Sequence, residues 1–172
     1  HRVYSLMSLV RLDDEFDILS DEVHDEAMKY LASVRDILMV TQFEDGHWPY
    51  NWPDGEAALE SPEGYDAYKD VIATGHHLEW LAIAPKELHP PHEQILKAAD
   101  WIIKNTTSKT KKEILSNYTF YSHVGNALAL WRNTRAPAFW KKWEAKHPFK
   151  AETDEVAVND TAEAATDEAV TD

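Results

Sequence analysis

The chain is organised around a short polar and aromatic stretch, TQFEDGHWP at residues 41–49. Before it, apolar residues such as Ala27, Leu31 and Leu38 recur at the spacing of one helix face. Asp45-Gly46 favours a tight turn, since both residue types tolerate turn backbone. Strand-like alternation is almost absent, and the 172 residues include only five glycines. The sequence therefore predicts an all-α fold in which this stretch begins a loop between helices.

Hydrophobic periodicity predicts six helices. They are expected at residues 2–12, 21–40 and 64–84, from Pro90-Pro91 up to about residue 104, and at 118–132 and 137–146. The first, third and fifth are apolar on most sides, which is typical of inner helices, whereas the second and fourth carry a single apolar stripe typical of outer helices. An acidic connection (13–20), a long loop (42–63) and a polar connection (105–113) separate them.

Two of the predicted inner helices look like copies of one repeat. ATGHHL at residues 73–78 and FYSHVG at 120–125 each place a histidine among small residues. HRVYSL at residues 1–6 reads as a third copy that begins at its own histidine. If the repeat is real, His123 and Asn126 face the same cavity as the histidines of the 73–78 segment.

Charge divides the chain into two parts. Its last 22 residues hold eight of the 31 acids and none of the 17 bases, and they contain no aromatic residue. Such a composition cannot bury enough apolar surface to order a chain. We expect a helical domain over residues 1–147 and an acidic, disordered tail over residues 148–172.

Composition also restricts the partners. The net charge of −14 opposes binding to a phosphate backbone, so we expect no nucleic-acid partner. No apolar run is long enough for a membrane span. Cysteine is absent, which excludes thiolate metal sites and a cysteine nucleophile. Because the chain begins with His1 in an amphipathic pattern, we expect it to be a piece of a longer protein.

The segment QFEDGHW at residues 42–48 resembles the Q-x-x-D-G-x-W loop of α/α-toroid proteins, which include squalene and hopene cyclases and prenyltransferase β subunits. The resemblance covers residues 24–83 well. It implies helical hairpins in a partial ring, with Gln42 and Trp48 joining neighbouring hairpins. A full toroid has more hairpins than this chain, so another chain or an upstream part is expected to complete it.

The segment GHHLEW at residues 75–80 puts polar groups into an apolar helix. His76 and Glu79 lie three residues apart and share a helix face. A histidine held by a carboxylate can act as a base or a metal ligand. The run also resembles the P-G-H-x-x-E-W motif of N-acylglucosamine 2-epimerase-like enzymes, with Thr74 in place of the proline.

That second resemblance implies a carbohydrate-active enzyme, epimerase-like or glycosidase-like. His76, Glu79 and His123 are then the catalytic candidates, and the ligand-binding candidates are His77, Trp48, Trp80 and Asn126. The rings of Trp48, Trp80, Tyr50 and Trp52 either stack on a ligand or pack the hairpins together. The structural alternative is a polar cluster that closes the inner ring through hydrogen bonds.

Two metal hypotheses arise from the sequence. DDEFD at residues 13–17 fits the D-D-x-x-D motif of class I terpenoid synthases, which implies magnesium held by Asp13, Asp14 and Asp17. The run lies among other acids and no second metal motif is visible, so a solvated acidic loop is the preferred interpretation. His1, His76 or His77, and His123 are three imidazoles that suit zinc. Because no carboxylate ligand is evident for that zinc, the sequence assigns neither a metal nor a cofactor.

The hypotheses rank as follows. The first is a structural or interaction module of the α/α-toroid type, since the chain lacks the D-x-D-D motif of squalene-type cyclases. A carbohydrate-active enzyme is the second, and a terpenoid cyclase-like enzyme is the third. Trp140 and Trp143, with Lys141, Lys142 and Lys146, form an amphipathic surface helix that either packs on the domain or contacts a partner.

Overall fold

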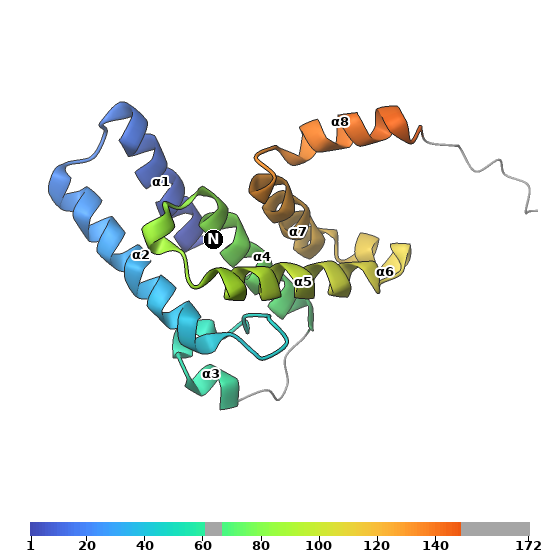
Figure 1. Cartoon of the computed structure of the whole chain (residues 1–172), viewed down its shortest axis with the longest axis horizontal. Helices are drawn as coiled ribbons and strands as arrows, with labels where there is room; N and C mark the ends of the chain where they lie inside the picture. Colours follow the sequence, from blue (N-terminus) through green and yellow to red (C-terminus); the bar gives the residue numbers. More distant parts are fainter. Residues whose placement is uncertain (61–66, 149–172) are drawn as a thin grey trace, which may run out of the picture.

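The computed structural model describes residues 1–60 and 67–148, and this part of the chain contains helices and no strand (Figure 1). The all-α prediction is therefore confirmed. The predicted disordered tail lies outside the described residues from residue 149 onward. The α-helices are α1 (Arg2–Phe16), α2 (Asp21–Thr41), α3 (Ala57–Glu60), α4 (Ala67–Ile83), α5 (His92–Thr107), α6 (Lys111–Ser116), α7 (Tyr118–Trp131) and α8 (Ala136–Lys146), and the two 3-10 helices are η1 (Trp52–Asp54) and η2 (Lys86–Leu88).

Helix α4 is the centre of the molecule, and it packs against α1, α5 and α7. Figure 1 shows it crossing the middle, with α1 and α2 on one side and α7 on the other. Its Leu78, Trp80 and Leu81 side chains are at most 1% exposed, so α4 is buried on more than one face. The prediction that this helix is an inner helix is confirmed, and the site described below is built on it.

Helices α2 and α5 lie on the outside, as their single apolar stripes predict. In α2 the buried positions are Ala27, Leu31, Val34, Leu38 and Thr41, and in α5 they are Ile95, Ala98 and Ile102. Ser20 caps α2 by accepting a hydrogen bond from the amide of Val23. Among the described residues, no helix combines the length and apolar character that a membrane span requires.

Helix α1 continues to Phe16, four residues beyond the predicted end. The acidic run that reads as a connection is its last turn. Asp13 accepts hydrogen bonds from the amides of Ile18 and Leu19, at 2.8 and 2.6 Å. Asp17 has left-handed backbone with φ 51°, which ends the helix. Asp13 terminates the helix because its side chain binds the backbone that leaves it, and Asp17 does so through its left-handed conformation.

The predicted polar connection at residues 105–113 is also wrong in part, because α5 continues to Thr107 and α6 begins at Lys111. Thr110 and Glu113 form a capping box at the start of α6, each side chain bonding the backbone of the other residue. The expected long loop after α2 likewise contains η1 and α3. Hydrophobic periodicity does not predict such short helices, because they extend over too few residues to show a repeating pattern.

The loop at residues 42–48 joins three helices. Gln42 donates from Nε2 to the carbonyls of Gly46 and Gln94, at 2.8 and 2.7 Å, which ties the loop to α5. Trp48 is fully buried and donates from Nε1 to the carbonyl of Leu38 in α2. Its backbone amide donates to Thr74 Oγ1 in α4. These contacts position α4 relative to both outer helices.

Helix α7 is covered on one side only. Tyr121, Val124, Ala127 and Ala129 are buried, whereas Tyr118 is 66% exposed and Ser122 and Gly125 are also exposed. An inner helix that is apolar nearly all round was expected here. The helix is exposed on the face of Tyr118, Ser122 and Gly125 because no other described element packs against that face.

Candidate functional site

Glu79 is the centre of a polar cluster between α4 and α7. Its side chain is 4% exposed, and His76 Nδ1 on the preceding helical turn lies 2.9 Å from Oε2. From α7, His123 Nδ1 lies 3.2 Å from Oε1 and 3.1 Å from Oε2, and Asn126 donates from Nδ2 to Oε1 at 2.7 Å. Both carboxylate oxygens are therefore used by protein donors from two helices.

The carboxylate is stabilised in its charged form. Burial alone raises the pKa of Glu79, but hydrogen bonds from His76 and Asn126 and the nearby His123 outweigh burial, and the net pKa is lowered. An ionised carboxylate only accepts hydrogen bonds, so the Nδ1 atoms of His76 and His123 carry the hydrogens. The Nε2 atom of each ring is left for another partner.

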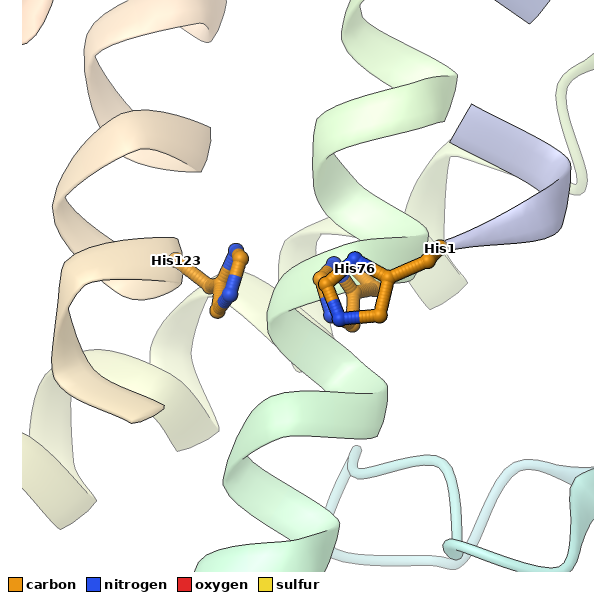
Figure 2. Close-up of side chains that lie close together, drawn as sticks. All are labelled: His1, His76 and His123. Atoms are coloured by element: carbon orange, nitrogen blue, oxygen red, sulfur yellow. The ribbon is translucent and has the colours of Figure 1, made fainter. Parts of the chain in front are cut away.

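Three histidine rings meet beside this carboxylate. Figure 2 shows His1 at the start of α1, His76 on α4 and His123 on α7 gathered together. Their ring centroids are 4.0 Å apart for His76–His123, 4.3 Å for His1–His76 and 5.7 Å for His1–His123. The three residues that the repeat pattern treats as equivalent thus lie at one place.

Gly75 allows α4 and α7 to approach each other closely at this point. No role for Gly75 was predicted from the sequence. A Cβ built on it would lie 3.3 Å from the Cβ of His123, which is tighter than an ordinary contact. The signal was present in the sequence, because a glycine inside an apolar helix often marks close packing.

His77 belongs to a different environment, although it follows His76 directly. Trp80 Nε1 donates to His77 Nδ1 at 3.2 Å, and the rings of Trp48 and Trp52 lie at 5.6 and 4.7 Å from it. Burial lowers the pKa of His77 to about 3, and electrostatic interaction with the nearby His76 adds to the effect. His77 is therefore a neutral core residue.

The predicted site residues consequently separate into two groups. His76, Glu79, His123 and Asn126 are in direct contact, as a shared cavity face would require. Trp48 and Trp80 are 0% and 1% exposed, so other protein groups cover their rings. Among the predicted ligand-binding residues, only Asn126 reaches the polar cluster.

We expect acid to destabilise the fold through His77. The unfolded chain takes up a proton on this ring near pH 6.5, whereas the folded chain stays neutral down to about pH 3. The unfolded state therefore binds more protons, and the free energy of unfolding falls by about 1.4 kcal/mol per pH unit below 6.5. Urea unfolding of chelator-treated protein between pH 7 and 4.5 measures this slope.

His77→Phe is the matched control, since phenylalanine fills the site and does not titrate. The variant is expected to be less stable at pH 7, because Trp80 Nε1 loses its acceptor. Its stability deficit should shrink as the pH falls to 4.5. Glu79 does not confuse this window, because a lowered carboxyl pKa removes stability only below 4.5. A constant deficit would contradict the assignment of the slope to His77.

The acids predicted to hold magnesium are engaged differently. Asp13 Oδ1 accepts the two amides that follow α1, and Asp14 forms an ion pair with Arg11 at 2.9 Å. Asp17 is the left-handed residue after the helix. Helix termination accounts for Asp13 and Asp17 here, and nothing in the geometry favours a shared cation.

Comparisons of the chain with protein-family models, curated proteins and solved structures gave no match. The resemblances to α/α-toroid proteins and to epimerase-like enzymes therefore stay predictions, and the site must be interpreted from its own geometry.

Proposed function

We propose that this chain is a structural or interaction module of the α/α-toroid type, and that exposed surfaces of its described residues assemble with a second copy. The observation that carries the proposal is the open face of α7. The resemblance of residues 42–48 to the toroid loop supports it, as do the contacts that this loop makes with α2, α4 and α5.

The repeat supplies the geometric reason. On α4, Gly75 packs against His123 of the next inner helix. Aligning His76 with His123 places Ser122 at the position of Gly75. Ser122 is exposed, and a Cβ built on Gly125 meets no described atom within 4 Å. Helix α7 therefore presents to solvent the face that α4 uses to bind its neighbour.

The two ends of the molecule have complementary character. At one end, Leu12, Phe16 and Ile18 are 48–60% exposed beside the acids of residues 13–17. At the other end, α8 exposes Phe139, Trp140 and Trp143 beside Lys141, Lys142 and Lys146. In Figure 1 the end of α1, which carries these acids, lies at the upper left and α8 lies at the upper right. The acids at the end of α1 and the lysines of α8 are opposite in charge, which favours head-to-tail association of these two surfaces.

The Glu79 cluster fits this function better than catalysis. A general base needs a carboxylate lone pair that reaches the substrate. Here Glu79 accepts four short contacts from three protein groups and is 4% exposed. The cluster acts as a clamp between α4 and α7. The carbohydrate-active alternative stays a prediction, since no contact in the cluster favours it.

Sedimentation velocity of the full chain tests the assembly. We expect concentration-dependent association that weakens as salt is raised, because the attraction between the ends is electrostatic in part. Lys141→Glu combined with Lys142→Glu should weaken association about tenfold or more, which corresponds to about 1.4 kcal/mol.

The control is Lys29→Glu combined with Lys86→Glu, which changes the net charge equally on exposed residues away from α8. This variant should associate like the original chain. A monomer at every concentration in low salt, or an equal loss in both double variants, would count against the head-to-tail assembly.

A further inference from the structure

One buried atom of the polar cluster is not used by the clamp. The Nε2 atom of His76 is buried and has no hydrogen-bond partner among the described residues. Its Nδ1 atom is held by Glu79, so the ring is fixed in orientation. An unpaired buried imidazole nitrogen is costly. The Nε2 atom of His77 in the core is unpaired too, but only the ring of His76 has two other imidazoles beside it.

Two further imidazoles lie beside the His76 ring. His1, His76 and His123 each offer one nitrogen, and these three nitrogens all lie within 4.8 Å of one another. In tetrahedral zinc sites the Zn–N distance is about 2.0–2.1 Å, which places ligand nitrogens about 3.4 Å apart. The largest nitrogen–nitrogen separation in the cluster must therefore shorten by up to about 1.4 Å to reach that geometry. His1 is exposed at the start of α1 and is the ring with room to move.

Glu79 has the position that a carboxylate often takes next to histidines that bind a metal. Such histidines bind the metal through one nitrogen and donate the other N–H to a carboxylate, which fixes the ring and raises its basicity. Glu79 accepts from the Nδ1 atoms of both His76 and His123. Asn126 in turn holds Glu79 Oε1 at 2.7 Å. Glu79 thus fixes two neighbouring rings, 4.0 Å apart between centroids, through Nδ1 and leaves the Nε2 atom of each ring free of the clamp.

We propose that His1, His76 and His123 bind one zinc ion, with His76 and His123 binding through Nε2 and the fourth position open to water or a small anion. Three imidazoles and no carboxylate in direct contact favour zinc and its neighbours in the first transition row over magnesium or calcium. The sequence assigned no metal because no carboxylate was evident. The structure supplies one, behind the ligands.

This inference goes beyond the proposed function, since the clamp uses the Nδ1 atoms and the metal uses the Nε2 atoms. The two can fail separately. The clamp is tested by the stability of metal-free protein, and the metal site by binding. Neither result depends on whether the chain associates head to tail.

Calorimetric titration of the full, untagged, chelator-treated chain with zinc chloride is the experiment. We expect one zinc per chain. Cobalt(II) chloride should bind at the same stoichiometry and give the intense visible absorption of four-coordinate cobalt. His1→Ala should weaken zinc binding about 100-fold or more, since loss of a supporting group alone costs 10–100-fold. His1 is exposed, so this variant should unfold at the same urea concentration as the original metal-free chain.

His92→Ala is the matched control, because His92 is an exposed histidine at the start of α5 and lies outside the cluster. It should bind zinc like the original chain. His123→Asn should weaken binding as His1→Ala does. The proposal is overturned if zinc does not bind at one equivalent, if cobalt stays six-coordinate, or if His1→Ala and His92→Ala bind zinc equally well.

Discussion

Glu79→Gln is expected to lower the free energy of unfolding by about 3–5 kcal/mol in metal-free protein. The carboxylate is 4% exposed and accepts from His76, His123 and Asn126. Glutamine keeps the shape but has one acceptor oxygen, and its amide hydrogens then face the donors of its former partners. At least one buried donor loses its partner, and the buried negative charge beside two imidazoles is removed.

Urea unfolding at pH 7 in the presence of a chelator measures this loss. Glu26→Gln is the control, because Glu26 lies on the exposed face of α2, where such a change usually alters stability by no more than about 0.5 kcal/mol. If Glu79→Gln unfolds at the same urea concentration as Glu26→Gln, the cluster does not hold α4 to α7. That result would contradict the structural role assigned to the clamp.

The sequence predicts the long helices well because each satisfies its own periodicity. The stripe of α2 and the all-round apolar character of α4 depend only on which face meets the core, and the structure confirms both. The errors lie where side chains bind the local backbone. Asp13 ends α1, and Thr110 with Glu113 starts α6. The second of these was readable, since T-x-x-E is the capping-box pattern.

The site divides in the same way. The spacing of His76 and Glu79 places them on one helix face, and they are in contact. The repeat pattern aligns His1, His76 and His123, which the structure brings together. Periodicity does not show that His77, one residue on, faces Trp52 in the core, nor that Glu79 reaches across to Asn126. Those contacts depend on which helix lies beside each face of α4, and that is a property of the packing.

The glycine of the Asp-Gly pair in the loop at residues 42–48 also depends on both local structure and packing. The turn explains only part of the need for glycine here. Gly46 has φ +108°, and a Cβ built on it would lie 2.4 Å from the carbonyl oxygen of Lys97 in α5. The glycine therefore does two things: it adopts a backbone that other residues avoid, and it lets the loop touch α5. Gly55 has φ +65° and open space around its Cβ position, so it does only the first.

Gly46→Ala is accordingly expected to destabilise the fold by about 3–5 kcal/mol, from backbone strain and from a contact that α5 cannot relieve without moving. Gly55→Ala should cost only the strain, about 1–2 kcal/mol. Urea unfolding of both variants measures the difference. Near-ultraviolet circular dichroism should change for Gly46→Ala alone, because Trp101 of α5 donates to Asp45 in this loop. Equal losses in the two variants would show that the glycine serves the turn and not the contact between the loop and α5. A larger loss at Gly46 would explain on physical grounds why a loop that joins an outer helix to an inner one carries glycine at this position, whichever family the chain belongs to.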